Sequence, residues 1–169
     1  MLDSIFTPEH CIEKLDYVGG IVRDNRNMFL SQKCYHTFKG MAYSHMNRLM
    51  NRERIGKRKE LVDKFDYDVK DASHIVRLMM ELKDILFRGT FEMDRYSDEI
   101  RAIRDGEWSK ERVVQTFELY MALFESDSKS FVVPYSPNED QIKMVLLQCL
   151  EEKFGNLSNI GFNFNYACE

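Results

Sequence analysis

The chain has 169 residues, of which 44% are hydrophobic and 31% charged, and its formal net charge is -4. This length suits a single domain with a sizeable core, and no apolar run approaches the roughly 20 residues that a membrane-spanning helix needs. The opening residues lack the basic and apolar regions of a secretion signal, and the four cysteines form no Cys-x-x-Cys pair. We therefore expect a cytoplasmic protein with free thiols and no membrane partner. Its few prolines and glycines and its ten methionines favour helices.

Basic residues are concentrated in one part of the chain. Between Lys33 and Lys64, nine Lys or Arg residues accompany three acidic ones, whereas from Glu125 onwards three basic residues accompany seven acidic ones. The basic stretch indicates an anionic partner, although a solvated basic surface has the same composition.

Hydrophobic spacing, capping residues and helix breakers predict a succession of helices. The first begins at Thr7-Pro8, because proline suits the first position of a helix, and Gly19-Gly20 is expected to break it. Gly40 lies inside a later helix, where glycine costs about 1 kcal/mol relative to alanine. It therefore marks either the close approach of a ligand or backbone, or a tolerated defect. The other predicted helices cover residues 23–30, 31–50, 60–65, 67–87, 97–103, 109–124 and 141–154.

The tail, residues 155–169, alternates small polar residues with large apolar ones. This pattern is compatible with a short strand or hairpin near the C-terminus. The predicted fold is otherwise mainly α, a single-domain helical bundle.

The helix predicted over 67–87 is the one around which the chain is organised. Asp68 or Asp71 is expected to cap its first turn, and Gly89 to end it. Its apolar residues recur at helical spacing and lie on one face. They are Ile75, Leu78, Met79, Leu82, Ile85 and Leu86.

A polar stripe runs along the same helix, formed by Lys70, His74, Arg77 and Glu81. Apolar residues border it on both sides, unlike an ordinary solvated face. One interpretation is a row of ion pairs, with Arg77 and Glu81 spaced i,i+4. The other is an anion site, in which Lys70, His74 and Arg77 converge on a phosphate or carboxylate.

The sequence shows no catalytic or metal-ligating motif. Asp66 and Asp68 are spaced like magnesium-binding aspartates, but they lead directly into a helix and are interpreted as helix-entry residues. No two histidines have the i,i+3 or i,i+4 spacing of zinc ligands on one helix. Phosphate-binding glycine loops and nucleophile elbows are also missing from the sequence.

Three segments together resemble polymerase-beta-like nucleotidyltransferases of the RNA-repair-pathway type. They are Phe29 to Arg48, Tyr67 to Met80, and Ile103-Arg-Asp-Gly-Glu-Trp-Ser109, which looks like the family's Arg-x-Gly-Glu turn. The resemblance covers about residues 1–125 and leaves 126–169 as a C-terminal helix and an aromatic tail. It implies the helical half that follows the catalytic sheet in such enzymes. By position it places a nucleotide-facing wall at Lys33, Tyr35, Gly40, Tyr43, Arg48, Lys70, His74 and Arg77.

The departures from this family limit the expected chemistry. The family's catalytic half, with its strand-borne aspartates, would precede Leu2, and Asp71 stands where the family usually has a histidine or similar residue. Without two-metal carboxylates, phosphoryl transfer loses its charge-neutralising clamp.

Two functions follow as expectations. The first is a protein without a cofactor that binds a nucleotide or RNA end, is not catalytic alone, and sequesters its ligand or inhibits a partner. The alternative is an accessory subunit that completes a separately encoded nucleotidyltransferase, with Mg²⁺ present only when that partner is. An accessory subunit would expose a large apolar patch, whereas a binding protein would cover it by self-association or with its aromatic tail.

Overall fold

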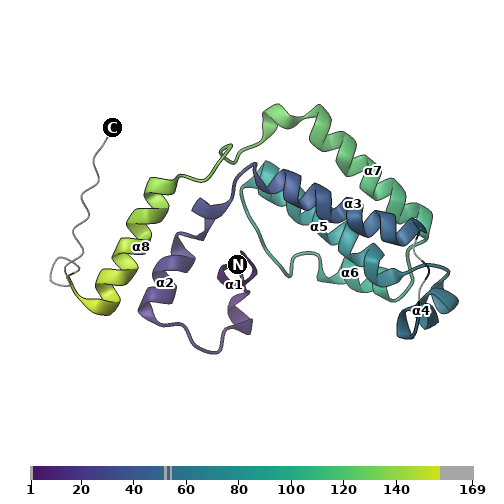
Figure 1. Ribbon diagram of the computed structural model, residues 1–169, viewed down its shortest axis with the longest axis horizontal. Helices are drawn as coiled ribbons and strands as arrows, with labels where there is room; N and C mark the ends of the chain where they lie inside the picture. The colour runs from purple at the N-terminus through teal and green to yellow at the C-terminus, as the bar shows by residue number, and fades with distance from the viewer. Residues whose placement is uncertain (1, 52, 54, 157–169) are drawn as a thin grey trace. The chain divides into compact units, whose positions relative to one another are not determined.

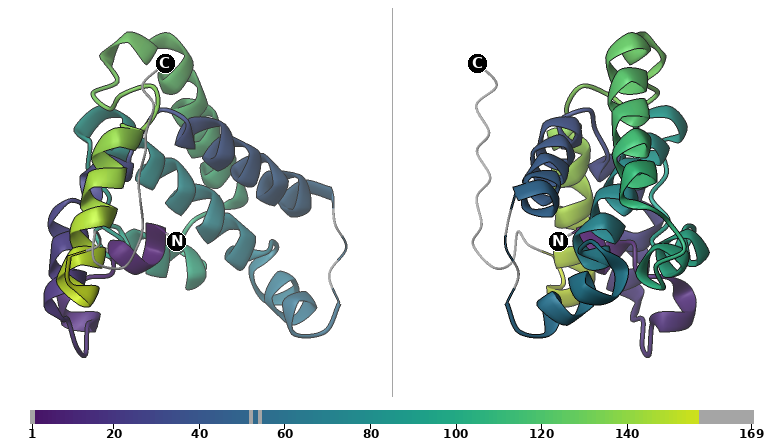
Figure 2. Two further views of the ribbon diagram at one scale, coloured as in Figure 1. Left: turned by 60° about the vertical axis from the view of Figure 1, so that its left-hand side comes forward. Right: turned by 90° about the vertical axis from the view of Figure 1, so that its right-hand side faces the viewer.

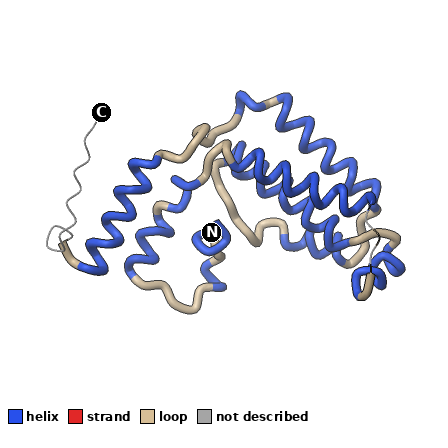
Figure 3. Tube along the Cα trace, in the orientation of Figure 1, coloured by secondary structure: helices blue, strands red, loops and turns tan. Residues whose placement is uncertain are grey.

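The computed structural model describes residues 2–51, 53 and 55–156, with side chains from Ser4 onwards. The protein is mainly α-helical, as predicted, and within the described residues no strand occurs (Figure 3). The predicted strand or hairpin falls almost entirely on residues 157–169, which lie outside the described part. None of the described helices is both long and apolar enough to cross a bilayer.

The chain divides into two units, Leu30–Ser136 and Met1–Phe29 with Pro137–Glu169. These units differ from the division into residues 1–125 and 126–169 that the sequence indicated. That division remains a prediction.

The first unit combines both ends of the chain. Its longest helices, α2 and α8, pack on each other. The predicted break at Gly19-Gly20 is wrong, because both glycines lie inside α2, where the carboxylate of Asp16 accepts a hydrogen bond from the Gly19 N–H at 2.7 Å. The helix predicted from Thr7 is reduced to one 3₁₀ turn. The elements of this unit are α1 (Leu2–Ile5), η1 (Glu9–Cys11), α2 (Tyr17–Asp24), η2 (Arg26–Phe29) and α8 (Glu139–Phe154).

The second unit is built around α5, which α3, α6 and α7 all contact (Figures 1 and 2). Most of the predicted apolar face of α5 is fully buried, including Ile75, Met79 and Leu82 at 0% exposure. Burying each such side chain stabilises the fold by roughly 1.5–3 kcal/mol. The helix that was predicted to organise the chain thus organises the second unit. The elements are α3 (Cys34–Asn51), α4 (Lys57–Phe65), α5 (Val69–Arg88), α6 (Ser97–Arg104), α7 (Lys110–Ser126) and η3 (Ser128–Ser130).

Both predicted ends of α5 are confirmed. Asp68 caps the helix, its carboxylate accepting hydrogen bonds from the Lys70 and Asp71 N–H groups at 3.0 and 3.1 Å. Gly89 ends it in the left-handed conformation at φ 65°, which glycine adopts without steric cost. Asp68 is therefore the cap, and Asp71 is left for another role.

Helices α3 and α5 run antiparallel. Near the start of α3, the Gln32 side chain donates to Val133 O, and the neighbouring Val132 N–H donates to Leu86 O at the end of α5. Towards the end of α3, His45 meets Asp71 in the first turns of α5. The two helices therefore run in opposite directions. We call the interface along which their side chains meet the seam.

Helix α4 is the least buried α-helix of this unit. None of its residues is buried, and it is bounded by Gly56 at φ 59° and Asp66 at φ 68°. At its end the Phe65 ring lies against Gly106, where an added Cβ would clash with the ring. The helix thus rests on the end of α6 through an aromatic ring that requires glycine.

Candidate functional site

The seam between α3 and α5 centres on a fully buried carboxylate. Nδ1 of His45 lies 2.8 Å from Oδ1 of Asp71, which is 0% exposed, and 2.6 Å from Nη2 of Arg48. A protonated Nδ1 donates to Asp71, whereas an unprotonated Nδ1 accepts from Arg48. The position of the histidine proton therefore decides which of the two neighbours it bonds.

Arginines neutralise this carboxylate from two helices. Arg58 of α4 lies 3.1 Å from Oδ2 of Asp68 and 3.2 Å from Oδ2 of Asp71, and Nε of Arg48 lies 3.5 Å from Oδ1 of Asp71. A buried charge is stable only when it is paired in this way. Asp68 and Asp71 are therefore engaged within the protein.

The next turn of α5 brings further cations to the seam. The rings of His45 and His74 have centroids 4.9 Å apart, and Nε of Arg104 donates to Ser73 Oγ at 3.4 Å. Burial, together with the nearby Arg77, His45 and Arg104, lowers the pKa of His74 to about 4, against the opposing effect of Asp71. His74 is therefore neutral at pH 7, in surroundings that are positive on balance.

Arg77 combines both interpretations of the polar stripe. Its Nε lies 3.8 Å from Oε1 of Glu81, so the i,i+4 ion pair exists, but that distance is too long for a hydrogen bond. The Nε atom is buried without a hydrogen-bond acceptor among the described residues. Lys70 is exposed, and its ammonium has no ion-pair partner in the described part of the chain. Next to His74 the stripe thus contains Arg77, which is partly paired, and Lys70, which is not paired by any described residue.

The predicted nucleotide-facing residues fall into two groups. The first group, Arg48, His74 and Arg77, lies along the seam, and Lys70 is exposed on α5. Tyr35 and Tyr43 instead turn towards α7, with ring centroids 6.1 Å from Phe124 and 5.1 Å from Phe117. Lys39 lies over both tyrosine rings and pairs with Glu125 at 3.2 Å. Lys33 is exposed just ahead of α3.

Gly40 lies on the solvent side of α3, and a Cβ placed on it would meet nothing within 4 Å. Contact with another backbone of the described chain therefore does not explain this glycine. Close approach of a ligand and a tolerated defect remain as the alternatives.

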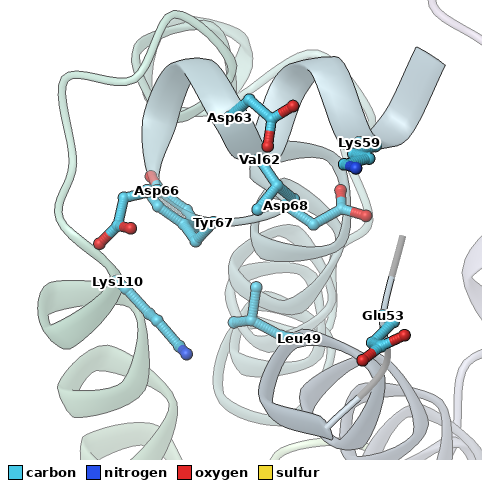
Figure 4. Close-up of a pocket in the computed structure, with 9 residues that line it drawn as sticks. All are labelled: Leu49, Glu53, Lys59, Val62, Asp63, Asp66, Tyr67, Asp68 and Lys110. Carbon is cyan, nitrogen blue, oxygen red and sulfur yellow. The ribbon is translucent and has the colours of Figure 1, made fainter. Parts of the chain in front are cut away.

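A hollow of about 490 Å³ opens at the end of the same seam that lies nearest α4 (Figure 4). Leu49 of α3 forms one side, Val62 and Asp63 of α4 the opposite side, and the Lys110 side chain reaches towards the space from α7. Two amines and four carboxylates surround an apolar floor. The lining residues are Leu49, Glu53, Lys59, Val62, Asp63, Asp66, Tyr67, Asp68 and Lys110.

Several members of the site carry no clear signal in the sequence. In the sequence, His45 is notable only for its i,i+3 spacing from the basic residue Arg48. Asp71 is notable only as a possible cap of the first turn of α5 and as a departure from the family. Arg58 and Arg104 do not stand out at all. Their partners lie on other helices, and periodicity along one helix carries no information about such contacts.

The described residues contain no group of three or more His, Cys, Asp and Glu side chains arranged to hold a metal ion. The described cysteines, Cys11, Cys34 and Cys149, are free. Comparison with protein-family models, curated proteins and solved structures found no match.

Proposed function

We propose that the protein binds the terminal phosphate of a nucleotide or RNA end at the seam between α3 and α5. The observation that carries this proposal is the buried Nε of Arg77, which has no acceptor among the described residues. Arg77 also lies close enough to His74 to lower the pKa of that histidine. A buried donor without a partner costs about 1–3 kcal/mol, and a phosphate oxygen would supply the missing acceptor.

The charge balance favours an anion at this position. Asp71 is already engaged by His45, Arg48 and Arg58, so it offers little neutralisation to the cations one turn further along α5. Arg77 and Lys70 remain to attract a ligand, and a guanidinium matches phosphate geometry well. Binding without chemistry is consistent with the resemblance to the helical half of a nucleotidyltransferase.

A bound phosphate would also change the protonation of His74. An anion within hydrogen-bonding distance favours the charged imidazole, so the pKa of His74 should rise from about 4. The protein should therefore take up protons on binding at pH values between the free and the bound pKa of His74.

Calorimetry tests the proposal directly. The full chain is titrated with inorganic phosphate, nucleoside triphosphates, and short RNAs carrying a 5′-phosphate, a 3′-phosphate or neither. Repeating the titrations in buffers of different ionisation enthalpy measures the proton uptake. His74→Gln should abolish the part of that uptake due to the histidine, because ionisation of the phosphate itself is the same for both proteins.

Arg77→Ala should weaken binding of phosphorylated ligands at least tenfold, whereas Arg101→Ala, which removes an exposed arginine of α6, should not. RNA with a terminal phosphate and free nucleotide distinguish the two sources of that phosphate. If no phosphorylated ligand binds, or if Arg77→Ala and Arg101→Ala bind equally well, the proposal fails. The accessory-subunit alternative would then become the leading prediction.

A further inference from the structure

We infer that the hollow beside α4 holds the base of the bound nucleotide, and that the base is guanine. This inference rests on the proposed function, because it assigns a position to the part of the nucleotide beyond the phosphate.

The hollow and the proposed phosphate site lie along the same pair of helices, on either side of the Asp71 network. Along α5, His74 is six residues from Asp68, which lines the hollow, and this corresponds to a rise of about 9 Å. Along α3, His45 is four residues from Leu49, which lines the hollow from the other helix, and this corresponds to a rise of about 6 Å. Because the two helices are antiparallel, both paths lead in the same direction. A nucleotide with its phosphate at Arg77 would extend its base towards the hollow.

The lining suits a flat, neutral, donor-rich group. Leu49, Val62 and the buried ring of Tyr67 provide apolar surface, and the Tyr67 hydroxyl is already occupied, donating to Trp108 O at 2.6 Å. Among the described lining residues the carboxylates outnumber the amines, which disfavours a phosphate there, so the ligand part that enters this hollow is the uncharged one.

Besides Glu53, two of the carboxylates are available for recognition. Asp68 is occupied by the amides of α5 and by Arg58. The side chains of Asp63 and Asp66, by contrast, make no hydrogen bond or ion pair with another residue that the structure describes, and both are exposed to the hollow. Each offers two acceptor oxygens and no donor.

Guanine fits these acceptors better than the other bases do. Its N1–H and 2-amino group are adjacent donors that can bond a single carboxylate with two parallel hydrogen bonds, while its O6 and N7 accept from an ammonium such as that of Lys59 or Lys110. Adenine presents one amino group beside an unprotonated ring nitrogen, which would face the carboxylate with a lone pair. Asp63 or Asp66 would therefore select guanine over adenine.

Competitive binding of four triphosphates tests this inference. The full chain is titrated with GTP, ITP, XTP and ATP. ITP lacks only the 2-amino group, and XTP replaces that donor with a carbonyl oxygen. We expect GTP to bind about tenfold or more tightly than ATP and ITP, because each loses a hydrogen bond to a charged group.

Asp63→Asn and Asp66→Asn identify the carboxylate. The variant that removes it should lower the affinity for GTP towards that for ATP, and should bind XTP better than the wild type does, because an asparagine amide donates to the added carbonyl. Glu118→Gln, an exposed change on α7, serves as the matched control and should keep the preference for GTP.

The outcomes separate the two proposals. Equal affinity for GTP and ATP overturns the guanine assignment and leaves phosphate binding standing. A preference for GTP that survives both aspartate variants overturns the assignment of the base to this hollow. If spermidine binds with an affinity that depends on Asp63 or Asp66 while nucleotides ignore both variants, the hollow is a site for organic cations. If no nucleotide binds at all, both proposals fail.

Discussion

His45 and Asp71 are 26 residues apart in sequence, yet Nδ1 of the histidine lies 2.8 Å from Oδ1 of a carboxylate that is fully buried. This contact joins α3 to α5 through a polar pair. The arginines that complete it are only partly buried, with 31% of the Arg48 and 38% of the Arg58 side chain exposed.

Replacing this carboxylate should destabilise the fold. Asp71→Asn keeps the size of the side chain but leaves Arg48 and Arg58 without their shared negative partner, and breaking a buried pair costs about 3–5 kcal/mol. We expect a loss near the lower limit, because water reaches both arginines. Urea unfolding should show it as a lower midpoint with an unchanged slope. Asp98→Asn, on an exposed turn of α6, is the control. Equal midpoints for the two variants would show that the network does not stabilise the fold.

Stability should fall as the pH is lowered below the ordinary pKa of histidine. The pKa of His74 is about 4 in the folded protein against 6.5 for an unperturbed histidine. Between these values the unfolded chain binds more protons than the folded one, so protonation favours unfolding. This contribution is absent above pH 6.5 and complete below about pH 4. Melting temperatures measured across this range should decline less steeply for His74→Gln than for the wild type or for His10→Gln. Parallel profiles would contradict the assignment.

A second buried carboxylate, Asp84, depends on a tyrosine. Oδ2 of Asp84 accepts from the Tyr96 hydroxyl at 2.8 Å and from Arg95 Nη1 at 3.0 Å, while Oδ1 has no hydrogen-bond donor among the described residues. Tyr96→Phe should therefore cost about 1.5–3 kcal/mol, the range for a hydrogen bond to a charged group. Tyr43→Phe removes a hydroxyl from an exposed ring and should cost almost nothing.

Burial, together with the hydrogen bond to Asp84, raises the pKa of Tyr96 to about 12. Spectroscopic titration of the tyrosines should therefore lose its most alkaline component in Tyr96→Phe. If that component persists, the hydroxyl is not held by Asp84.

Two glycine-to-alanine changes should have opposite effects. Gly106 has φ 82°, and an added Cβ would clash with the Phe65 ring, so Gly106→Ala should destabilise the attachment of α4 to α6. Gly40 lies in the middle of α3 with open space around it, so Gly40→Ala should stabilise the protein by about 1 kcal/mol. Denaturant midpoints measure both. A destabilised Gly40→Ala would show that α3 is strained at this position.

Gly40→Ala also separates the two remaining explanations of this glycine. If the stabilised variant binds phosphorylated ligands as well as the wild type does, the glycine is a tolerated defect. If its affinity falls, the ligand approaches the backbone of α3.

The sequence was sufficient to predict α5 because every signal there agrees. Its apolar spacing, the cap at Asp68 and the stop at Gly89 all mark the same helix. It was misleading at Gly19-Gly20, where glycine predicts a break, because the hydrogen bond from Gly19 to Asp16 supports the first turn of α2. Helix propensity is small enough for one cap to offset it.

The candidate site was predictable only along one helix at a time. Spacing placed His74 and Arg77 on a common face of α5, and that placement holds. Spacing did not show that His45 would face them across the seam, or that Tyr35 and Tyr43 would turn towards α7. Which faces of two helices meet is decided by tertiary packing, and a single sequence does not report it.

The pairing of α2 with α8 has a consequence for how the protein is made. The first unit draws on both ends of the chain, and the whole of Leu30–Ser136 is translated between them. During synthesis α2 therefore leaves the ribosome without the helix that packs on it, and this face of α2 stays open to other chains or to chaperones until α8 emerges. The second unit meets no such delay, since all of its helices are consecutive. The order of translation thus assigns early folding to the unit that carries the candidate site.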